Sequence, residues 1–296
     1  MFVQTGDVLD RGLEGQRMLK FLWALQDEQP ASIILFIGNH EAMLLTREYK
    51  YSNSGPSFAD KCTYTLDPAG CQAQRSAWRT YTCTDPLGGP AHLDGCVDRA
   101  WSGDGLMGRQ LLERMRTGQL KMAHLVAGTI FVHAGVTLGA LRRLAEAGAR
   151  PDNYIEVMNA LALRAISERR HGDFLLTAEG DGLGAPSKDG PAWTRDFALE
   201  DEEQCEGVFD VLKVLGARRM VKGHDPTVKS GTRAIGEAKT LCNGTLFLTD
   251  TFMSEGYTGD RKTSEHNLMA GETSTEGDDR RFVYPMRRRN TCSGPL

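Results

Sequence analysis

The chain carries two stretches that decide its fold: FVQTGDVLDRG at residues 2–12 and IILFIGNHE at residues 33–41. Each begins with an apolar run of strand length and breaks at a glycine that is followed by polar side chains. Between them, apolar residues recur at helical spacing from residue 16 to residue 25. Strand, loop, helix, strand and loop in this order predict an α/β fold with parallel strand pairing.

The rest of the chain resumes this pattern after a long interruption. Residues 51–118 are rich in Pro, Gly, Ser, Asp and Cys, which indicates an insertion that is mostly loop with short helices. The other elements that we expect are helices at 42–48, 138–146, 155–169 and 199–215, a loop at 172–193, and strands at 125–132, 219–221 and 246–248. We assign residues 1–258 to one domain and residues 259–296, which are polar and biased in composition, to a disordered tail.

Composition excludes several classes of protein. Of the 296 residues, 40% are hydrophobic and 25% are charged, which argues against wholesale disorder. The net charge of -4 gives no electrostatic case for a nucleic-acid partner. The apolar runs are too short for a transmembrane helix. The 33 glycines are an excess, which predicts many turns or places where the backbone is crowded.

Four polar side chains directly follow apolar strands: Asp7, Asn39, His133 and His224. Because the carboxyl ends of strands in an open α/β sheet share the edge where ligands bind, these side chains can converge on one point. Taken singly, each has an ordinary explanation, such as a turn former for Asp7 or a core histidine for His133. Their joint occurrence favours a site of oxygen and imidazole ligands, which suits Mn²⁺, Fe or Zn²⁺.

The order of these motifs resembles that of the calcineurin-like metallophosphoesterases. Gly-Asp-x-x-Asp-Arg-Gly at 6–12 is followed by Gly-Asn-His-Glu at 38–41, His-Ala-Gly at 133–135 and Gly-His at 223–224. Within the family, the set is most similar to the phosphoprotein phosphatase branch and, inside it, to the Shewanella-like protein phosphatases. The resemblance covers roughly residues 2–257 and implies a four-layer α/β/β/α sandwich, two mixed sheets flanked by helices, here without its first strand.

The resemblance also implies a role for each of the four strand-end residues. Asp7 matches a carboxylate that bridges two divalent metal ions, and Asn39, His133 and His224 match the remaining ligands of the second ion. Two such ions about 3.5–4 Å apart hold a hydroxide that attacks phosphorus. The family takes two ligands of the first ion from a Gly-Asp-x-His-Gly motif, and none precedes Gly6. We therefore expect a truncated sequence or a real short form, with an incomplete first metal site and severely impaired activity.

Further residues match the catalytic machinery of the family. His40 matches the general acid that protonates the leaving alkoxide, and Asp10 matches its carboxylate partner. Arg11 matches a phosphate clamp, since a planar guanidinium suits phosphate oxygens. Trp-x-Arg ending at Arg195 matches a second clamp, although a surface arginine in a loop is the alternative. The run Asp-Thr-Phe-Met-Ser around Phe252 resembles the closing strand and turn of the family, where a glycine is usual at that position.

Four of the seven cysteines lie in the insertion, namely Cys62, Cys71, Cys83 and Cys96. None of the seven forms a C-x-x-C pair, so a zinc ribbon is unsupported. Four cysteines in a loop-rich insertion are typical of a disulfide-stapled excursion, which would indicate an oxidising compartment or organelle. Ordinary thiols are the alternative, and the spacing does not choose among the three pairings.

We expect a metal-dependent phosphomonoester hydrolase, and within that class a protein phosphatase that acts on a phosphorylated protein or peptide. Asp10 within Asp-Arg-Gly favours this branch of the family. One rival is a dinucleoside polyphosphate hydrolase of the same fold. A rival of another class is an inactive scaffold that binds phosphorylated partners, which the missing motif supports. The identity of the metal pair, the preference for Ser/Thr or Tyr phosphate and the oligomeric state stay open.

Overall fold

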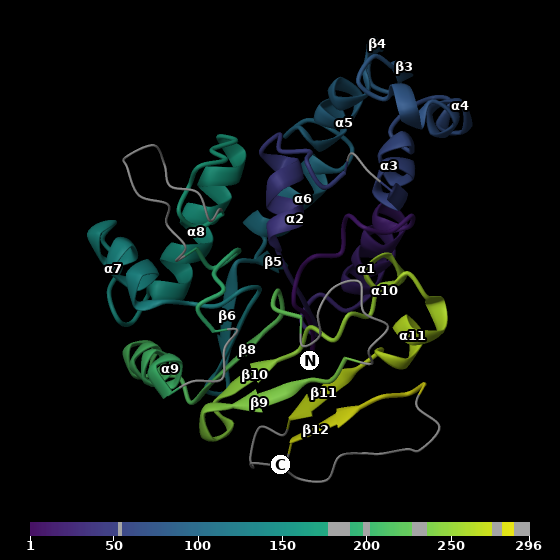
Figure 1. The fold of residues 1–296 in the computed structure, drawn as a ribbon. Coiled ribbons are helices and arrows are strands. Elements are labelled where there is room, and N and C mark those ends of the chain that lie inside the picture. Colours follow the sequence, from purple (N-terminus) through teal and green to yellow (C-terminus); the bar gives the residue numbers. More distant parts are fainter. Residues whose placement is uncertain (53–54, 177–189, 198–201, 227–235, 274–279, 287–296) are drawn as a thin grey trace.

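The computed structural model describes residues 1–52, 55–176, 190–197, 202–226, 236–273 and 280–286 (Figure 1). Its first sheet has the strand order β1-β2-β5, and all three strands run in parallel. These strands are β1 (Phe2–Gln4), β2 (Ile33–Phe36) and β5 (Leu120–Lys121). The predicted parallel pairing of the two stretches near the start of the chain is confirmed.

The second sheet is mixed, with the order β6-β7-β8-β10-β9. Its members are β6 (Ala123–Val126), β7 (Thr129–Val132), β8 (Arg219–Lys222), β9 (Lys239–Leu241) and β10 (Leu246–Leu248). Strands β7, β8 and β10 are parallel, and the two edge strands are antiparallel to their neighbours. The single strand predicted at 125–132 is therefore wrong, because Ala127 and Gly128 adopt left-handed φ values of 48° and 71° and turn the chain into a hairpin.

Helices pack against both sheets. They are α1 (Gly15–Glu28), α2 (Asn39–Leu45), α7 (Leu138–Glu146), α8 (Tyr154–Ser167) and α9 (Glu202–Leu215). Helix α1 contacts β2, α8 contacts β6 and α9 contacts β8, and one hydrophobic core joins these helices to both sheets. This agrees with the layered α/β fold that was predicted. None of the helices in the described ranges is both long and apolar enough to cross a membrane.

The insertion contains more regular structure than was predicted. It comprises α3 (Gly55–Cys62), α4 (Pro68–Ala73), the 3₁₀ turn η1 (Arg75–Ala77), the hairpin β3 (Thr82–Asp85) and β4 (Gly89–His92), α5 (Leu93–Trp101) and α6 (Gly108–Arg116). In Figure 1, α3, α4, β3 and β4 project away from the sheets. Helices α5 and α6 belong instead to the main core, because Val97, Trp101 and Leu111 are buried in it.

Disulfides join the cysteines of the insertion to one another. Cys62 pairs with Cys71 and Cys83 pairs with Cys96, so the predicted stapling is present. A third disulfide, Cys205–Cys242, ties α9 to the 3₁₀ turn η2 (Cys242–Gly244) that precedes β10. The seventh cysteine, Cys292, lies outside the described residues.

Two boundaries differ from the predicted ones. Helix α2 begins at Asn39, three residues earlier than predicted, so Asn39 and His40 belong to its first turn. The segment predicted as a disordered tail contains ordered elements, which follow the short helix α10 (Glu255–Thr258): α11 (Arg261–His266), β11 (Ala270–Thr273) and β12 (Arg280–Val283). Phe282 of β12 packs edge-on against Phe247 with a centroid distance of 6.3 Å, which gives this hairpin an apolar anchor.

Candidate active site

The loops after β1 and β2 approach each other closely because glycines stand where they meet. Gly6 has a φ of 92°, and a Cβ there would lie 2.7 Å from Nδ1 of His133. A Cβ on Gly38 would overlap Oδ1 of Asp7. The neighbouring Asp7 and Arg11 are not glycines and still adopt a φ of 56° each. Left-handed backbone at non-glycine residues costs energy and is concentrated at functional sites.

Four of the predicted ligands converge, as the sequence predicted. One terminal atom of the Asn39 amide lies 3.1 Å from Nε2 of His133 and 3.1 Å from Nδ1 of His224. The amide oxygen would face a bound cation, and in its absence the rotated amide donates from its NH₂ group to the same nitrogens. The two ring nitrogens are 3.2 Å apart, and Oδ2 of Asp7 is 3.4 Å from Nε2 of His133. Asp7 and Asn39 follow strands of the first sheet, whereas His133 and His224 follow strands of the second. The site therefore lies where the two sheets meet.

The chemistry of this cluster fits a divalent cation. His133 donates its Nδ1 proton to the carbonyl oxygen of Thr5 at 2.7 Å, which leaves a lone pair on Nε2 that faces the cluster. An amide oxygen, a carboxylate and two imidazoles suit Mn²⁺, Fe or Zn²⁺. Among the described residues, Asp7, His133 and His224 form the one group of three or more His, Cys, Asp or Glu ligands with atoms close enough to share an ion.

Electrostatics in the cluster favour a charged Asp7. Burial alone would raise the pKa of Asp7, but the imidazoles of His133 and His40 outweigh burial and hold that pKa well below its usual range. Burial would lower the pKa of His133, yet the adjacent Asp7 raises it. Burial and the neighbouring His133 hold the pKa of His224 well below its usual range. A neutral His224 beside an ionised Asp7 is the protonation state that a metal site needs.

Beside this cluster lies the predicted acid pair. Nδ1 of His40 is 2.7 Å from Oδ2 of Asp10, and the ring of His40 is almost fully buried. The backbone N–H of His40 donates to Oδ1 of Asp7 at 3.1 Å, which fixes this pair to the cluster of Asp7, Asn39, His133 and His224. Arg11 places Nη1 2.7 Å from Nε2 of His40. A guanidinium only donates, so Nε2 accepts and the ring proton lies on Nδ1, toward Asp10.

Two tyrosines that the sequence did not single out hold Arg11. Its guanidinium carbon lies 4.9 Å from the ring centroid of Tyr51 and 4.6 Å from that of Tyr257, and Nη1 also donates to the hydroxyl of Tyr257. These two cation–π contacts and the hydrogen bond to Tyr257 hold the guanidinium in place. Since Tyr51 comes from the start of the insertion and Tyr257 from α10, no local sequence signal connects them to Arg11.

Arg195 stands at the edge of the site and is more exposed than the other predicted residues. Its Nη1 donates to Oδ1 of Asp225 at 2.8 Å, and its side chain is 59% exposed. Asp225 also pairs with the fully buried Lys222 and directly follows His224. Asp225 therefore fixes Arg195 beside the cluster while most of the Arg195 side chain stays exposed.

The motifs assign no role to Glu41, yet its buried carboxylate connects the loops of the site. One oxygen accepts the backbone N–H groups of Val8 at 2.8 Å and Leu9 at 3.0 Å, and the other accepts those of Gly38 at 2.8 Å and Asp7 at 3.0 Å. A Glu three residues after Gly38, the N-cap of α2, is a capping-box signal that could have revealed one of these bonds. The other three bonds join loops that are distant in sequence.

Phe252 occupies the position where the resembling family has a glycine. Its φ is 58°, so the backbone keeps the left-handed conformation that glycine adopts without strain. The side chain is buried, and its ring lies 4.8 Å from that of Tyr257. Phe252 therefore buttresses one of the two rings that hold Arg11.

Comparisons with known proteins bear on this geometry. No protein-family model matches the chain. An uncharacterised protein of Schizosaccharomyces pombe is 25% identical over 263 residues, which cover 88% of this chain. Shewanella-like protein phosphatase 1 of Plasmodium berghei is 23% identical over 283 residues, which cover 91% of it. The chain spans 63% of the length of each of these two curated relatives.

Comparison with solved structures shows that the fold of this chain is similar to that of protein phosphatases. A mutant cold-active protein tyrosine phosphatase superposes with a TM-score of 0.59 at 16% identity, over 97% of this chain and 68% of the other. The cold-active protein tyrosine phosphatase of a psychrophilic Shewanella species gives 0.54 at 16% identity, over 96% and 64%. The chain is thus similar in sequence to a Shewanella-like protein phosphatase and similar in fold to cold-active protein tyrosine phosphatases, which confirms the resemblance predicted from its motifs.

Proposed function

We propose that this protein hydrolyses phosphate monoesters on phosphorylated proteins or peptides. The observation that carries the proposal is the convergence of Asp7, Asn39, His133 and His224 beside the Asp10–His40 pair and Arg11. The names of the similar proteins, protein phosphatase and protein tyrosine phosphatase, support the same reaction class.

The four converging residues would hold one divalent cation, Mn²⁺, Fe or Zn²⁺. Bound there, the ion would supply positive charge against phosphate oxygens and lower the pKa of a bound water. Asp7 offers a carboxylate, Asn39 an amide oxygen, and each histidine a ring nitrogen that faces the cluster. A second ion, which the resemblance implies, would take Asp7 as its shared ligand.

Arg11 and His40 act on different parts of the substrate, the phosphate oxygens and the leaving oxygen. The guanidinium of Arg11, which two tyrosine rings contact, binds the phosphate oxygens. When it turns to the phosphate it leaves Nε2 of His40, which takes up a proton from water. The resulting imidazolium, held by Asp10 through Nδ1, gives that proton to the leaving oxygen. Arg195 lies at the rim as the second clamp.

The direct test measures phosphate release from p-nitrophenyl phosphate and from matched phosphotyrosine and phosphoserine peptides, with and without Mn²⁺. Because the first metal site is incomplete, we expect slow metal-dependent turnover, and His40→Ala should lower it by a further factor of about 10² to 10⁴, the usual contribution of a general acid. His92→Ala, in the exposed β4 strand, is the matched control. Equal rates for wild type, His40→Ala and Asp7→Ala would refute the proposal. Preference for a dinucleoside tetraphosphate would favour the rival hydrolase, and peptide binding without turnover would favour a scaffold.

A further inference from the structure

Lys50 stands beside the candidate active site and takes no part in the proposed reaction. Its ammonium nitrogen lies 5.2 Å from the ring centroid of Tyr51 and 5.6 Å from that of Trp193. The ring of Tyr51 is also 4.9 Å from that of His40, and the ring of Trp193 is 6.0 Å from that of His224. The fold therefore places Lys50 between a ring that contacts His40 and a ring that contacts His224.

The two segments that carry these side chains are anchored by their backbones. Shortly before Trp193, the carbonyl oxygen of Pro191 accepts the backbone N–H of Ala134 at 2.9 Å, which ties this loop to the end of β7. The backbone N–H of Lys50 donates to Oε1 of Glu48 at 3.2 Å, while the side chain of Lys50 is exposed. An exposed ammonium on an anchored backbone can meet a ligand with little loss of chain entropy.

The ammonium group of Lys50 lacks an acidic partner. Its contacts within the described part of the chain are the two aromatic rings, and no carboxylate there forms an ion pair with it. Oε2 of the nearby Glu48 lies instead 3.9 Å from Nε2 of His171. Arg195 differs from Lys50, because it pairs with Asp225 at 2.8 Å. An anionic group from a substrate would therefore supply the partner that Lys50 lacks.

The distance between Lys50 and Arg11 limits how far this anionic group lies from the phosphate. Nζ of Lys50 is 5.2 Å from the ring centroid of Tyr51, and the guanidinium carbon of Arg11 is 4.9 Å from the same point. The two cations are therefore separated by no more than the sum of these distances. Since an extended peptide advances about 3.3 Å per residue, a side chain within about three positions of the phosphorylated residue can reach Lys50.

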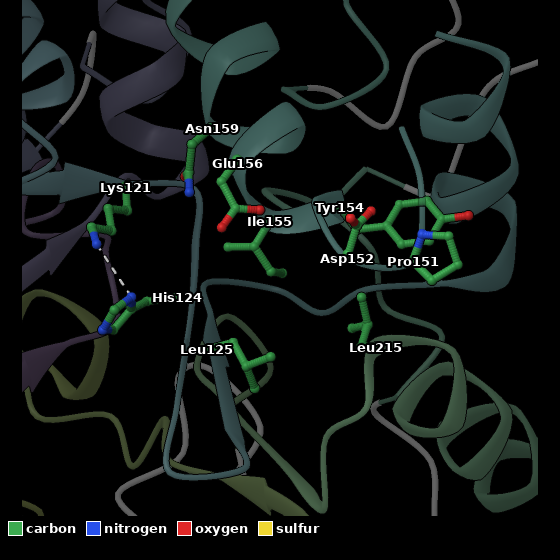
Figure 2. Close-up of a pocket in the computed structure, with 10 residues that line it drawn as sticks. All are labelled: Lys121, His124, Leu125, Pro151, Asp152, Tyr154, Ile155, Glu156, Asn159 and Leu215. Carbon is green, nitrogen blue, oxygen red and sulfur yellow. Dashed lines mark hydrogen bonds between the residues drawn. The ribbon is translucent and has the colours of Figure 1, made fainter. Parts of the chain in front are cut away.

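A second lysine, Lys121, stands beside a pocket but does not offer such a site. Figure 2 shows that its side chain points toward His124, and Nζ of Lys121 lies 3.2 Å from Nδ1 of that ring. Asp152 and Glu156 also line the pocket. Their negative charges oppose an anionic ligand there, whereas no carboxylate pairs with Lys50 in the described residues.

We propose that Lys50, beside the rings of Tyr51 and Trp193, is a specificity-determining residue that binds an acidic side chain of the substrate close to the phosphorylated residue. This recognition rests on the proposed phosphatase function and adds the class of peptide that the site selects, an acidic one. Because the pair would form at an exposed position, it gives a preference for acidic peptides and not a strict requirement. Arg11 and the bound cation would still hold the phosphate itself.

The test measures affinity, so its result does not depend on turnover. Fluorescein-labelled peptides with a central phosphonomethyl-phenylalanine, a phosphotyrosine mimic that cannot be hydrolysed, are titrated with the full chain and Mn²⁺ while fluorescence anisotropy is recorded. Matched peptides carry Glu, Gln or Lys at the positions on either side of the mimic. The wild type should bind the Glu peptide about 2- to 5-fold more tightly than the Gln peptide, the effect of an exposed ion pair. Added salt should reduce this difference.

Two substitutions at Lys50 separate recognition from a structural role. Lys50→Met should remove the preference for the Glu peptide, and Lys50→Glu should reverse it, so that the Lys peptide binds most tightly. A residue that only supports the fold would change the affinity of all three peptides alike. Lys20→Glu, on the exposed face of α1, is the matched control and should leave the preference unchanged.

Turnover of p-nitrophenyl phosphate, measured separately, distinguishes failure of this proposal from failure of the proposed function. If the wild type turns over this substrate but binds the three peptides equally or not at all, the role of Lys50 is overturned and the phosphatase function stands. A preference for the Glu peptide that survives in Lys50→Met also overturns it. If a preference that depends on Lys50 is found without turnover, the recognition of acidic peptides stands and the hydrolytic function fails.

Discussion

Replacement of Glu41 by glutamine should destabilise the protein by about 3–6 kcal/mol. The carboxylate of Glu41 accepts four backbone N–H groups, two on each oxygen. A glutamine amide can present its oxygen to one pair only, so its NH₂ group faces the other two donors. Each lost hydrogen bond to a charged group is worth about 1.5–3 kcal/mol. Burial and the nearby charge of Asp7 raise the pKa of Glu41, which means that the charged carboxylate is disfavoured there. Because the neutral glutamine relieves both effects, the lower end of the range is expected.

The assay is urea unfolding followed by tryptophan fluorescence, which reports the free energy of unfolding. Total stabilities of about 5–15 kcal/mol are usual, so the expected loss is a large fraction of the whole. Glu28→Gln, at the exposed end of α1, is the matched control and should change the free energy of unfolding by less than about 0.5 kcal/mol. The reasoning fails if the free energy of unfolding of Glu41→Gln is within about 1 kcal/mol of that of the wild type, since the loss of two hydrogen bonds to a charged group should cost more than that.

Three more predictions concern other parts of the molecule. Burial raises the pKa of Asp60 to about 7 from an ordinary 3.8, so the folded state binds this proton more tightly than the unfolded state, and the free energy of unfolding of the wild type should fall by up to about 4 kcal/mol as the pH rises from about 4 to 7. Asp60→Asn should remove that loss, which is measured by urea unfolding at pH 4 and pH 8. An equal effect of the substitution at both pH values would contradict this prediction. Tyr257→Phe keeps the aromatic ring beside Arg11 but loses the hydrogen bond between the tyrosine hydroxyl and Nη1 of Arg11, so the KM for a phosphopeptide should rise about 2- to 12-fold with little change in kcat. A fall in kcat with an unchanged KM would contradict this prediction. The Cys205–Cys242 disulfide spans 37 residues and the Cys62–Cys71 disulfide spans 9, so replacing the first pair by serines should lower the free energy of unfolding by about 1 kcal/mol more than replacing the second. The measurement compares the urea unfolding of the two double-serine variants. The opposite ranking would show that loop entropy does not dominate.

Much of the fold could be predicted because apolar runs ended at strong breakers. Helix α7 and strand β10 have the predicted limits, since each run is bounded on both sides by polar or turn residues. The apolar run at 125–132 was predicted as one strand because Ala127 and Gly128 interrupt it weakly, and only their left-handed φ values make it a hairpin. In the insertion, composition alone indicated loop, but burial of Val97 and Trp101 in the main core stabilises helix α5 there.

In the candidate site, the residues within motifs could be predicted and the residues that support them could not. The convergence of the four strand-end residues and the contact between His40 and Asp10 could be predicted, because these residues lie next to strand ends at the shared edge of the sheets. The residues that hold this machinery could not be predicted in the same way. Tyr51 and Tyr257 lie 206 positions apart, and both contact Arg11 only because the insertion and α10 fold back over the same loop.

The candidate metal site depends on how the two sheets are placed relative to each other. Asp7 and Asn39 are attached to the first sheet, and His133 and His224 to the second, so any slip between the sheets would change the distances among these four proposed ligands. The structure resists such a slip on the active-site side through the bond from His133 to the carbonyl oxygen of Thr5, which runs from one sheet to the other. On the outer side, Asn159 fixes the junction of β5 and β6 through three bonds. Loss of either restraint should therefore weaken metal binding without touching a ligand, because the ligands depend on the register of the sheets.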